Sequence, residues 1–139
     1  MNKFLITLAC LPLASAWALD TQPLSGAEQL PIARMTENGK TYLFDAKGFS
    51  LYRFDKDAQG KSTCYAECAE KWPPALASAE QAKAGVGSAA DVGISLILRD
   101  DGNYQWSYRG QPLYRWIKDE QPGQSSGDGV KNVWHRVQL

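Results

Sequence analysis

The chain has 139 residues, of which 44% are hydrophobic, and it carries 15 basic and 15 acidic residues. This length is enough for one small domain with a modest core. Because the formal net charge is zero, no overall field gathers phosphates or anionic lipids, which argues against nucleic-acid and membrane-surface binding.

Residues 1–18 have the features of a signal peptide: Lys3, an apolar run over 4–13, and small residues up to Ala18. We therefore expect cleavage after Ala18, an exported domain over 19–139 in the periplasm or outside the cell, and no transmembrane segment after cleavage. The alternative is a lipid anchor on Cys10, but the leucine before Cys10 sits one place late for that signal. Cleavage after Ala18 is the favoured interpretation.

The first elements expected after the signal are three strands, at 32–36, 41–45 and 51–54, separated by turns at Asn38-Gly39 and Gly48. Asn-Gly favours the positive φ of a tight hairpin, and alternating aromatic residues in the second strand indicate one buried face. These strands predict an antiparallel three-stranded meander.

Two short helices follow the strands. The first is expected over 64–71, with Thr63 as a candidate N-cap and Trp72-Pro73-Pro74 as its end, because proline cannot continue a helix. The second is expected over 79–84, where Ser78 and Gln81 have the spacing of a capping box.

The remaining sequence repeats the first half with a shift of 62 positions, as from Tyr42 to Tyr104, and without a gap. Repeat 1 covers about 32–74 and repeat 2 about 94–139. An internal repeat predicts one supersecondary unit per copy. The predicted fold is mainly β: two tandem meanders forming one small domain across a pseudo-twofold axis, with a shared aromatic core. The paired residues are Tyr42 and Tyr104, Phe44 and Trp106, Gly48 and Gly110, Leu51 and Leu113, Tyr52 and Tyr114, Arg53 and Arg115, Phe54 and Trp116, Lys56 and Lys118, Asp57 and Asp119, and Trp72 and Trp134.

The repeated motif places two aromatic residues two positions apart on one sheet face, with an aspartate just past the strand. The structural interpretation, which we favour, is two core rings and an aspartate that fixes the following loop. The functional interpretation is an aromatic and acidic ligand surface in each copy. The candidate residues are Tyr52, Phe54, Asp57 and Trp72 in the first copy, and Tyr114, Trp116, Asp119 and Trp134 in the second.

With this motif the chain resembles a family of secreted repeats and predicted lipoproteins that carry Tyr-x-(Phe/Trp/Tyr)-x-x-Asp. The matching segments are 51–57, Cys64-x-x-x-Cys68 with 72–74, 99–102, 108–119 and Trp134. The resemblance implies an exported or cell-envelope protein of bacteria, in a family without an established activity. The poor lipid-anchor signal around Cys10 departs from that pattern and points to an unanchored form.

Cys64 and Cys68 are four residues apart, which would place their Cα atoms roughly 6 Å apart in a helix, within the range of a disulfide. We favour a disulfide, since export permits it. The sharper alternative is a soft metal ion such as Cu(I), or thiol-redox chemistry, with His135 as a third ligand. His135 corresponds to Pro73 in the repeat, so the duplication gives no reason for it to approach Cys64.

The sequence offers few residues from which a catalytic site could be built. His135 is the only histidine, and no serine lies in a nucleophile-elbow context. We expect no enzyme activity and no cofactor. The leading interpretation is a non-catalytic envelope module that binds an envelope protein or glycan through exposed aromatic residues, with Tyr65, Tyr108 and Trp134 as candidates. The alternative is a periplasmic metal-handling or thiol-redox protein that uses Cys64 and Cys68.

Overall fold

The computed structural model describes residues 22–23 and 32–139. The predicted cleavage site after Ala18 and the candidate lipid site at Cys10 lie outside the described residues. Within them, no helix is long and apolar enough to cross a membrane. The strands are β1 (Gln22–Pro23), β2 (Ile32–Glu37), β3 (Lys40–Asp45), β4 (Tyr52–Phe54), β5 (Ile94–Leu98), β6 (Tyr104–Tyr108), β7 (Gln111–Pro112) and β8 (Trp134–Arg136). The helices are α1 (Glu67–Lys71) and α2 (Ala79–Ala84), with 3-10 turns at Gly87–Val92 and Val130–Asn132.

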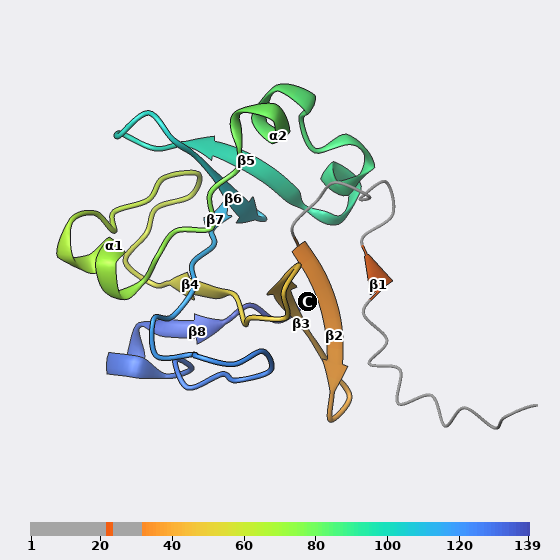
Figure 1. The fold of residues 1–139 in the computed structure, drawn as a ribbon, viewed down its shortest axis with the longest axis vertical. Helices are drawn as coiled ribbons and strands as arrows, with labels where there is room; N and C mark the ends of the chain where they lie inside the picture. The colour runs from red at the N-terminus through yellow and green to blue at the C-terminus, as the bar shows by residue number, and fades with distance from the viewer. Residues whose placement is uncertain (1–21, 24–31) are drawn as a thin grey trace, which may run out of the picture.

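The strands form three small antiparallel sheets, β1-β2-β3, β5-β6-β7 and β4-β8 (Figure 1). The mainly β, duplicated architecture is as predicted. In the first copy the third strand of the meander pairs with β3 only at its start, where a bridge joins Phe44 and Ser50 and Leu51 donates to the Leu43 carbonyl, and the strand then continues as β4. It then pairs with β8 of the second copy, placing Phe54 opposite Trp134. A strand of three residues gains most of its hydrogen bonds and burial from a neighbour on each side, and β8 supplies one of them.

Each copy also contributes a segment near its end to the sheet of the other copy. Ala75 donates its N–H to Leu113 at 2.9 Å and accepts from Trp106 at 2.8 Å. Its counterpart Val137 donates to Leu51 at 3.1 Å and accepts from Leu43 at 3.0 Å. Each copy therefore completes the sheet of the other.

The pseudo-twofold axis passes between two equivalent tyrosines. The N–H of Tyr52 donates to the carbonyl of Tyr114 at 2.8 Å, and the N–H of Tyr114 donates to the carbonyl of Tyr52 at 2.9 Å. Two counterparts that bond to each other reciprocally lie on either side of the axis that relates them. In Figure 1 the yellow β4 and the blue β8 lie side by side near this centre.

Residues at equivalent positions in the sheets of the two copies are not always 62 positions apart in the sequence. Ala33 pairs with Phe44, whereas its counterpart Ser95 pairs with Ser107, so Phe44 corresponds to Ser107 and Leu43 to Trp106. The turn before β6 is one residue longer than the turn before β3, and the turn after β6 is one residue shorter. The expected equivalence of Phe44 and Trp106 is therefore wrong in the structure, although the two changes cancel in the sequence.

Two buried clusters lie on opposite sides of the two segments, 51–52 and 113–114, that pair across the pseudo-twofold axis. Leu51 and Leu113 belong to a mainly aliphatic core, while the next residues, Tyr52 and Tyr114, belong to an aromatic cluster. Successive side chains of an extended chain point to opposite faces, so the same two segments separate and support both clusters. The aliphatic core also contains Ile32, Leu43, Ala89, Ile94, Trp106, Tyr108 and Val137. The aromatic cluster also contains Cys64, Trp72, Trp116 and Trp134.

Both predicted helices are present, one of them shorter than expected. α2 covers 79–84, and its capping box is formed by Ser78 and Gln81 in both directions, at 3.1 and 2.9 Å. α1 begins at Glu67 rather than at residue 64, and Thr63 does not cap it. The chain is turned away from the helical path at Ala66, whose φ is 51°, because the segment before it is held elsewhere.

Candidate functional site

The motif aspartates hold the motif tyrosines of the opposite copy. The Tyr52 hydroxyl donates to Asp119 Oδ2 at 2.5 Å, and the Tyr114 hydroxyl donates to Asp57 Oδ2 at 2.6 Å. Both tyrosines are fully buried. Burial, and then the hydrogen bond to the carboxylate, raises the pKa of each hydroxyl well above its usual value. The tyrosines therefore stay neutral donors at any physiological pH.

The second oxygen of each aspartate fixes the loop that follows it. Asp57 Oδ1 accepts from the N–H and hydroxyl of Thr63 at 2.7 and 2.8 Å. Asp119 Oδ1 accepts from the N–H and hydroxyl of Ser126 at 2.9 and 2.7 Å. The predicted loop-fixing role of the motif is thus present, and it explains why Thr63 is not a helix cap.

Four rings form one continuous stack that alternates between the copies. Phe54 lies on Trp134 at a centroid distance of 4.1 Å, Trp134 on Trp72 at 3.9 Å, and Trp72 on Trp116 at 4.0 Å. The two central rings are the counterparts Trp72 and Trp134, inclined by only 3°. The loop after Asp119 passes close to this stack, since a Cβ on Gly127 would lie 2.8 Å from the Trp72 ring. Glycine is needed there for space.

A cavity of about 790 Å³ opens over this stack and is the candidate ligand site. All four stacked rings line it, together with Ile117, whose exposed fraction is 59%. The charged residues that line it are Lys56, Lys71, Lys118, Lys131 and Glu67. Its volume and its mostly apolar lining are those of a site for a drug-sized molecule. The remaining lining residues are Cys68, Ser126, Val130 and Val133.

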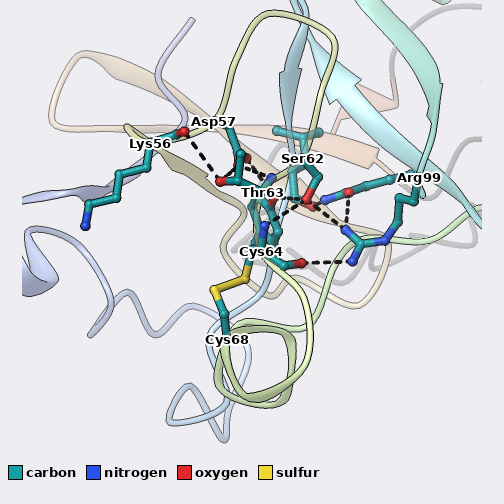
Figure 2. The surroundings of a disulfide bond; sticks show 10 residues. Lys56, Asp57, Ser62, Thr63, Cys64, Cys68 and Arg99 are labelled. Carbon is teal, nitrogen blue, oxygen red and sulfur yellow. Dashed lines mark hydrogen bonds between the residues drawn. A yellow bond between two sulfur atoms is a disulfide. The ribbon is translucent and has the colours of Figure 1, made fainter. Parts of the chain in front are cut away.

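Cys64 and Cys68 are joined by a disulfide beside this cavity, with Cα atoms 5.3 Å apart (Figure 2). Cys64 is fully buried, whereas Cys68 is half-buried and lines the cavity. In this state neither sulfur is a thiolate, which is the form that binds metal ions or attacks a disulfide. The favoured disulfide is the state that the structure contains.

Comparison with known protein families decides the classification. The model of a family described as a secreted repeat of unknown function matches residues 33–76 and again 95–138. The chain belongs to this secreted-repeat family. The two matched segments begin 62 residues apart, as the internal repeat does (95 − 33 = 62). No curated protein and no solved structure matches the chain.

Membership in the secreted-repeat family identifies the protein as an exported one, and the structure gives the repeat boundaries a physical meaning. Each matched segment includes the residue, Ala75 or Val137, that pairs with the sheet of the other copy. One secreted repeat therefore includes a strand that it donates to its partner. A single repeat lacks the strand that completes its own sheet.

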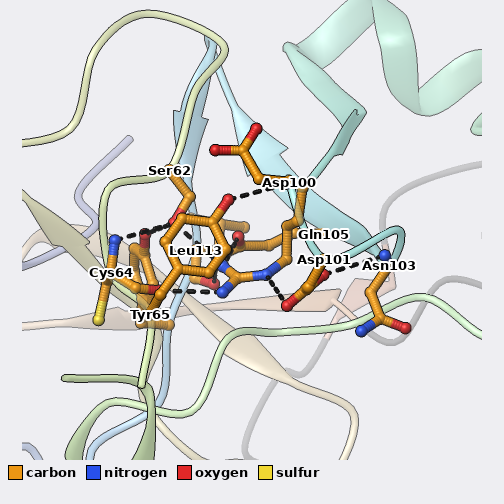
Figure 3. Close-up of polar contacts among 10 residues, drawn as sticks. Ser62, Cys64, Tyr65, Asp100, Asp101, Asn103, Gln105 and Leu113 are labelled. Atoms are coloured by element: carbon orange, nitrogen blue, oxygen red, sulfur yellow. Dashed lines mark hydrogen bonds and ion pairs between the residues drawn. The ribbon is translucent and has the colours of Figure 1, made fainter. Parts of the chain in front are cut away.

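Sequence reasoning missed the role of Arg99, a buried arginine that ties the start of the second repeat to the disulfide loop of the first (Figure 2). Figure 3 shows the residues that Arg99 contacts: Ser62, Cys64, Tyr65 and Gln105. The Arg99 guanidinium donates to the Cys64 carbonyl at 2.9 Å, to Gln105 at 2.7 Å and to Ser62 at 3.0 Å. It also lies 4.3 Å from the centre of the Tyr65 ring. The sequence indicated the importance of Arg99 only through the motif segment 99–102, which it begins. The counterpart of Arg99 in the first repeat is Glu37, so the duplication does not predict this contact.

His135 lies in β8, where its ring contacts Asp55 at 2.8 Å, and this contact engages Nε2. Desolvation, the largest single influence, raises the pKa of Asp55, but the hydrogen bond from His135 and the charges of His135 and Arg53 together lower it. Within 22–23 and 32–139 no group of three His, Cys, Asp or Glu residues is arranged to hold a metal ion. The structure does not bring His135 together with Cys64 and Cys68 as a ligand set.

Of the three aromatic residues named as candidates for partial exposure, Tyr65 is partly exposed and the other two are buried. Tyr65 is half-buried, as expected, but Tyr108 is 5% exposed and Trp134 is 3% exposed. Tyr108 packs in the aliphatic core opposite Ile94, and Trp134 is covered on both faces in the ring stack. The exposed apolar residue beside the cavity is instead Ile117.

Proposed function

We propose that this protein is a non-catalytic binding module of the cell envelope, and that the cavity over the ring stack is its ligand site. The observation that carries the proposal is the convergence of four aromatic rings from both repeats on one open cavity. An exposed apolar side chain, Ile117, lies at the same place. Exposed apolar surface at an aromatic-lined cavity is typical of a binding site.

The non-catalytic part of the proposal rests on how the candidate acid and base groups are used. Asp57 and Asp119 accept hydrogen bonds through both oxygens from groups that position loops and core tyrosines. His135 is engaged by Asp55. The charged groups left at the cavity are ammonium groups and the Glu67 carboxylate, which is bonded to Lys71 at 2.9 Å. Such a set suits binding and orientation of a ligand.

The test uses Ile117→Glu, which places a carboxylate beside the cavity, and Leu98→Glu as the matched control. Leu98 is 61% exposed, close to the 59% of Ile117, and it does not line the cavity. The protein, purified from the envelope fraction of the producing cells, is examined by native mass spectrometry. We expect a non-covalent adduct on the wild-type and Leu98→Glu proteins and its loss from Ile117→Glu.

Two results would contradict this proposal. One is a wild-type protein free of any adduct, and the other is an adduct that Ile117→Glu retains in full. The non-catalytic part is checked on the same sample, because the released molecule should keep its mass after prolonged incubation with fresh protein. A change in that mass would identify the protein as an enzyme.

A second candidate, thiol-redox activity, is favoured by the position of Cys68 at the cavity. In such a reaction the two cysteines, once reduced, would be oxidised to the disulfide while a partner disulfide is reduced to two thiols. A Cys64→Ser/Cys68→Ser double variant separates the candidates. It should keep the adduct if the protein is a binding module, and it should lose all activity in a disulfide-reduction assay if redox chemistry is the function.

A further inference from the structure

The inner rings of the stack present only their edges to the cavity. Trp134 is covered by Phe54 on one face and by Trp72 on the other, and Trp72 is covered by Trp134 and Trp116. The faces of an aromatic ring are the negative part of its quadrupole and the edges are the positive part. At these two inner rings, Trp72 and Trp134, a ligand therefore meets ring edges of slightly positive character. A sugar that binds by stacking on an open ring face finds no such face on these two inner rings.

The rim of the cavity carries an excess of positive charge, although the whole chain has a net charge of zero. Four lysines and one glutamate line it, a local sum of three positive charges (4 − 1 = 3). The one carboxylate, Glu67, is already bonded to Lys71, and the hydrogen bond from Lys71 lowers the pKa of Glu67. Lys118 holds its ammonium 5.7 Å from the centre of the Trp116 ring. Charge and ring edges thus favour the same sign of ligand.

The duplication places two of these lysines around the axis. Lys56 and Lys118 are counterparts in the repeat, each one residue before its motif aspartate, and both line the same cavity. The aspartates beside them do not line it, because their oxygens are held by Tyr114 and Tyr52. The fold therefore separates basic from acidic residues that are adjacent in sequence. The two lysines therefore line the cavity without the carboxylates that neighbour them in sequence.

We propose that the cavity takes an organic anion: an acidic group that sits among the lysines at the rim and an apolar body that lies against the ring edges and Ile117. This inference rests on the proposed function and names the chemical class of its ligand. The acidic group can be a carboxylate, a sulfonate or a phosphate, since all of them accept hydrogen bonds from ammonium groups. The volume of about 790 Å³ suits a molecule of drug size.

The test compares three probes that share one apolar body and differ in charge: naphthalenesulfonate, naphthylmethanol and naphthylmethylammonium. Binding to the exported protein is measured by isothermal titration calorimetry at low and at high salt. We expect the sulfonate to bind about tenfold more tightly than the ammonium at low salt, with the alcohol between them. The difference should shrink at high salt, because the lysines are exposed and salt screens them.

A pair of double variants assigns the effect to the rim. Lys56→Gln/Lys118→Gln should weaken sulfonate binding about fivefold and leave naphthylmethanol binding unchanged. The matched control is Lys40→Gln/Lys83→Gln, which removes two exposed lysines that do not line the cavity and should change neither affinity. A circular dichroism spectrum that matches the wild type checks that both variants are folded.

Each outcome bears on one of the two proposals. Equal affinity for the three probes would overturn the anion inference and leave the binding cavity in place. A preference for the ammonium, or a sulfonate affinity that the rim variant leaves unchanged, would also overturn it. If none of the probes binds, the anion inference fails, and the native adduct and its response to Ile117→Glu decide the proposed function separately.

Discussion

Each motif aspartate uses its two oxygens for different partners. One oxygen fixes a loop of its own repeat, and the other accepts the hydroxyl of a tyrosine that belongs to the opposite repeat. Asp119 is 4% exposed, so its carboxylate depends on these bonds. A buried acceptor that loses its partner costs about 1–3 kcal/mol. The motif therefore joins loop structure to the contact between repeats.

The buried tyrosines predict a loss of stability at alkaline pH. Burial, and then the bond to the carboxylate, raises the folded-state pKa of Tyr52 and Tyr114 above the unfolded value of about 10. Their contribution is fully present below pH ~10 and is lost as pH rises toward the folded pKa, because only the unfolded chain loses the protons. Above pH ~10 each tyrosine should lower the free energy of unfolding by about 1.4 kcal/mol per pH unit.

Urea denaturation at a series of alkaline pH values measures this slope. Tyr52→Phe should be less stable at neutral pH by about 1–3 kcal/mol and should have a shallower alkaline slope than the wild type. Tyr104→Phe is the control, because Tyr104 is 43% exposed. An alkaline slope that Tyr52→Phe leaves unchanged would refute the prediction.

At the scale of elements, the short strands are stabilised because each one pairs with a strand of the other repeat. β4 and β8 are three residues each and pair with each other across the repeats. The loop between β4 and α1 has two further restraints, the disulfide and the hydrogen bond from Arg99 to the Cys64 carbonyl. The loop is therefore held by several contacts rather than by the disulfide alone.

The disulfide should accordingly make a modest contribution to stability. Closing so short a loop is worth about 2 kcal/mol on the chain-entropy estimate, so Cys64→Ser/Cys68→Ser should lower the free energy of unfolding by about that amount and leave the protein folded. Urea denaturation of the variant and of the wild type, with and without a reductant, measures the difference. The reduced wild type should match the variant. Complete unfolding of either one would contradict this assignment.

At the scale of the molecule, the chain is organised as a fused pseudo-dimer. Its axis runs between Tyr52 and Tyr114, its aromatic stack alternates between repeats, and its cavity takes lining residues from both. The connection between the repeats, residues 85–93, carries Ala89 into the aliphatic core. The binding cavity and the repeat contact are thus parts of one structure, and neither exists in a single repeat.

Separately produced repeats should therefore fold only together. We expect a fragment ending at Ala84 and a fragment beginning at Gly85 to lack native structure alone, since each lacks the strand that the other donates. An equimolar mixture should recover the circular dichroism of the intact chain and elute as a one-to-one complex in size-exclusion chromatography. A first fragment that is cooperatively folded by itself would show that the exchange is not required. The second fragment, tested in the same way, gives the matching control.

The sequence by itself determined the duplication, the strands and turns, the capping box of α2, the cysteine pair and the family. These features depend on residues close in sequence or on comparison of one copy with the other. Only the tertiary structure decided that β4 pairs with β8, that Tyr52 bonds to Asp119 rather than to Asp57, and that four rings stack over a cavity. The physical reason is the symmetry of a repeat: local spacing is the same whether a side chain meets its own copy or the other, and only chain connectivity and packing choose between them.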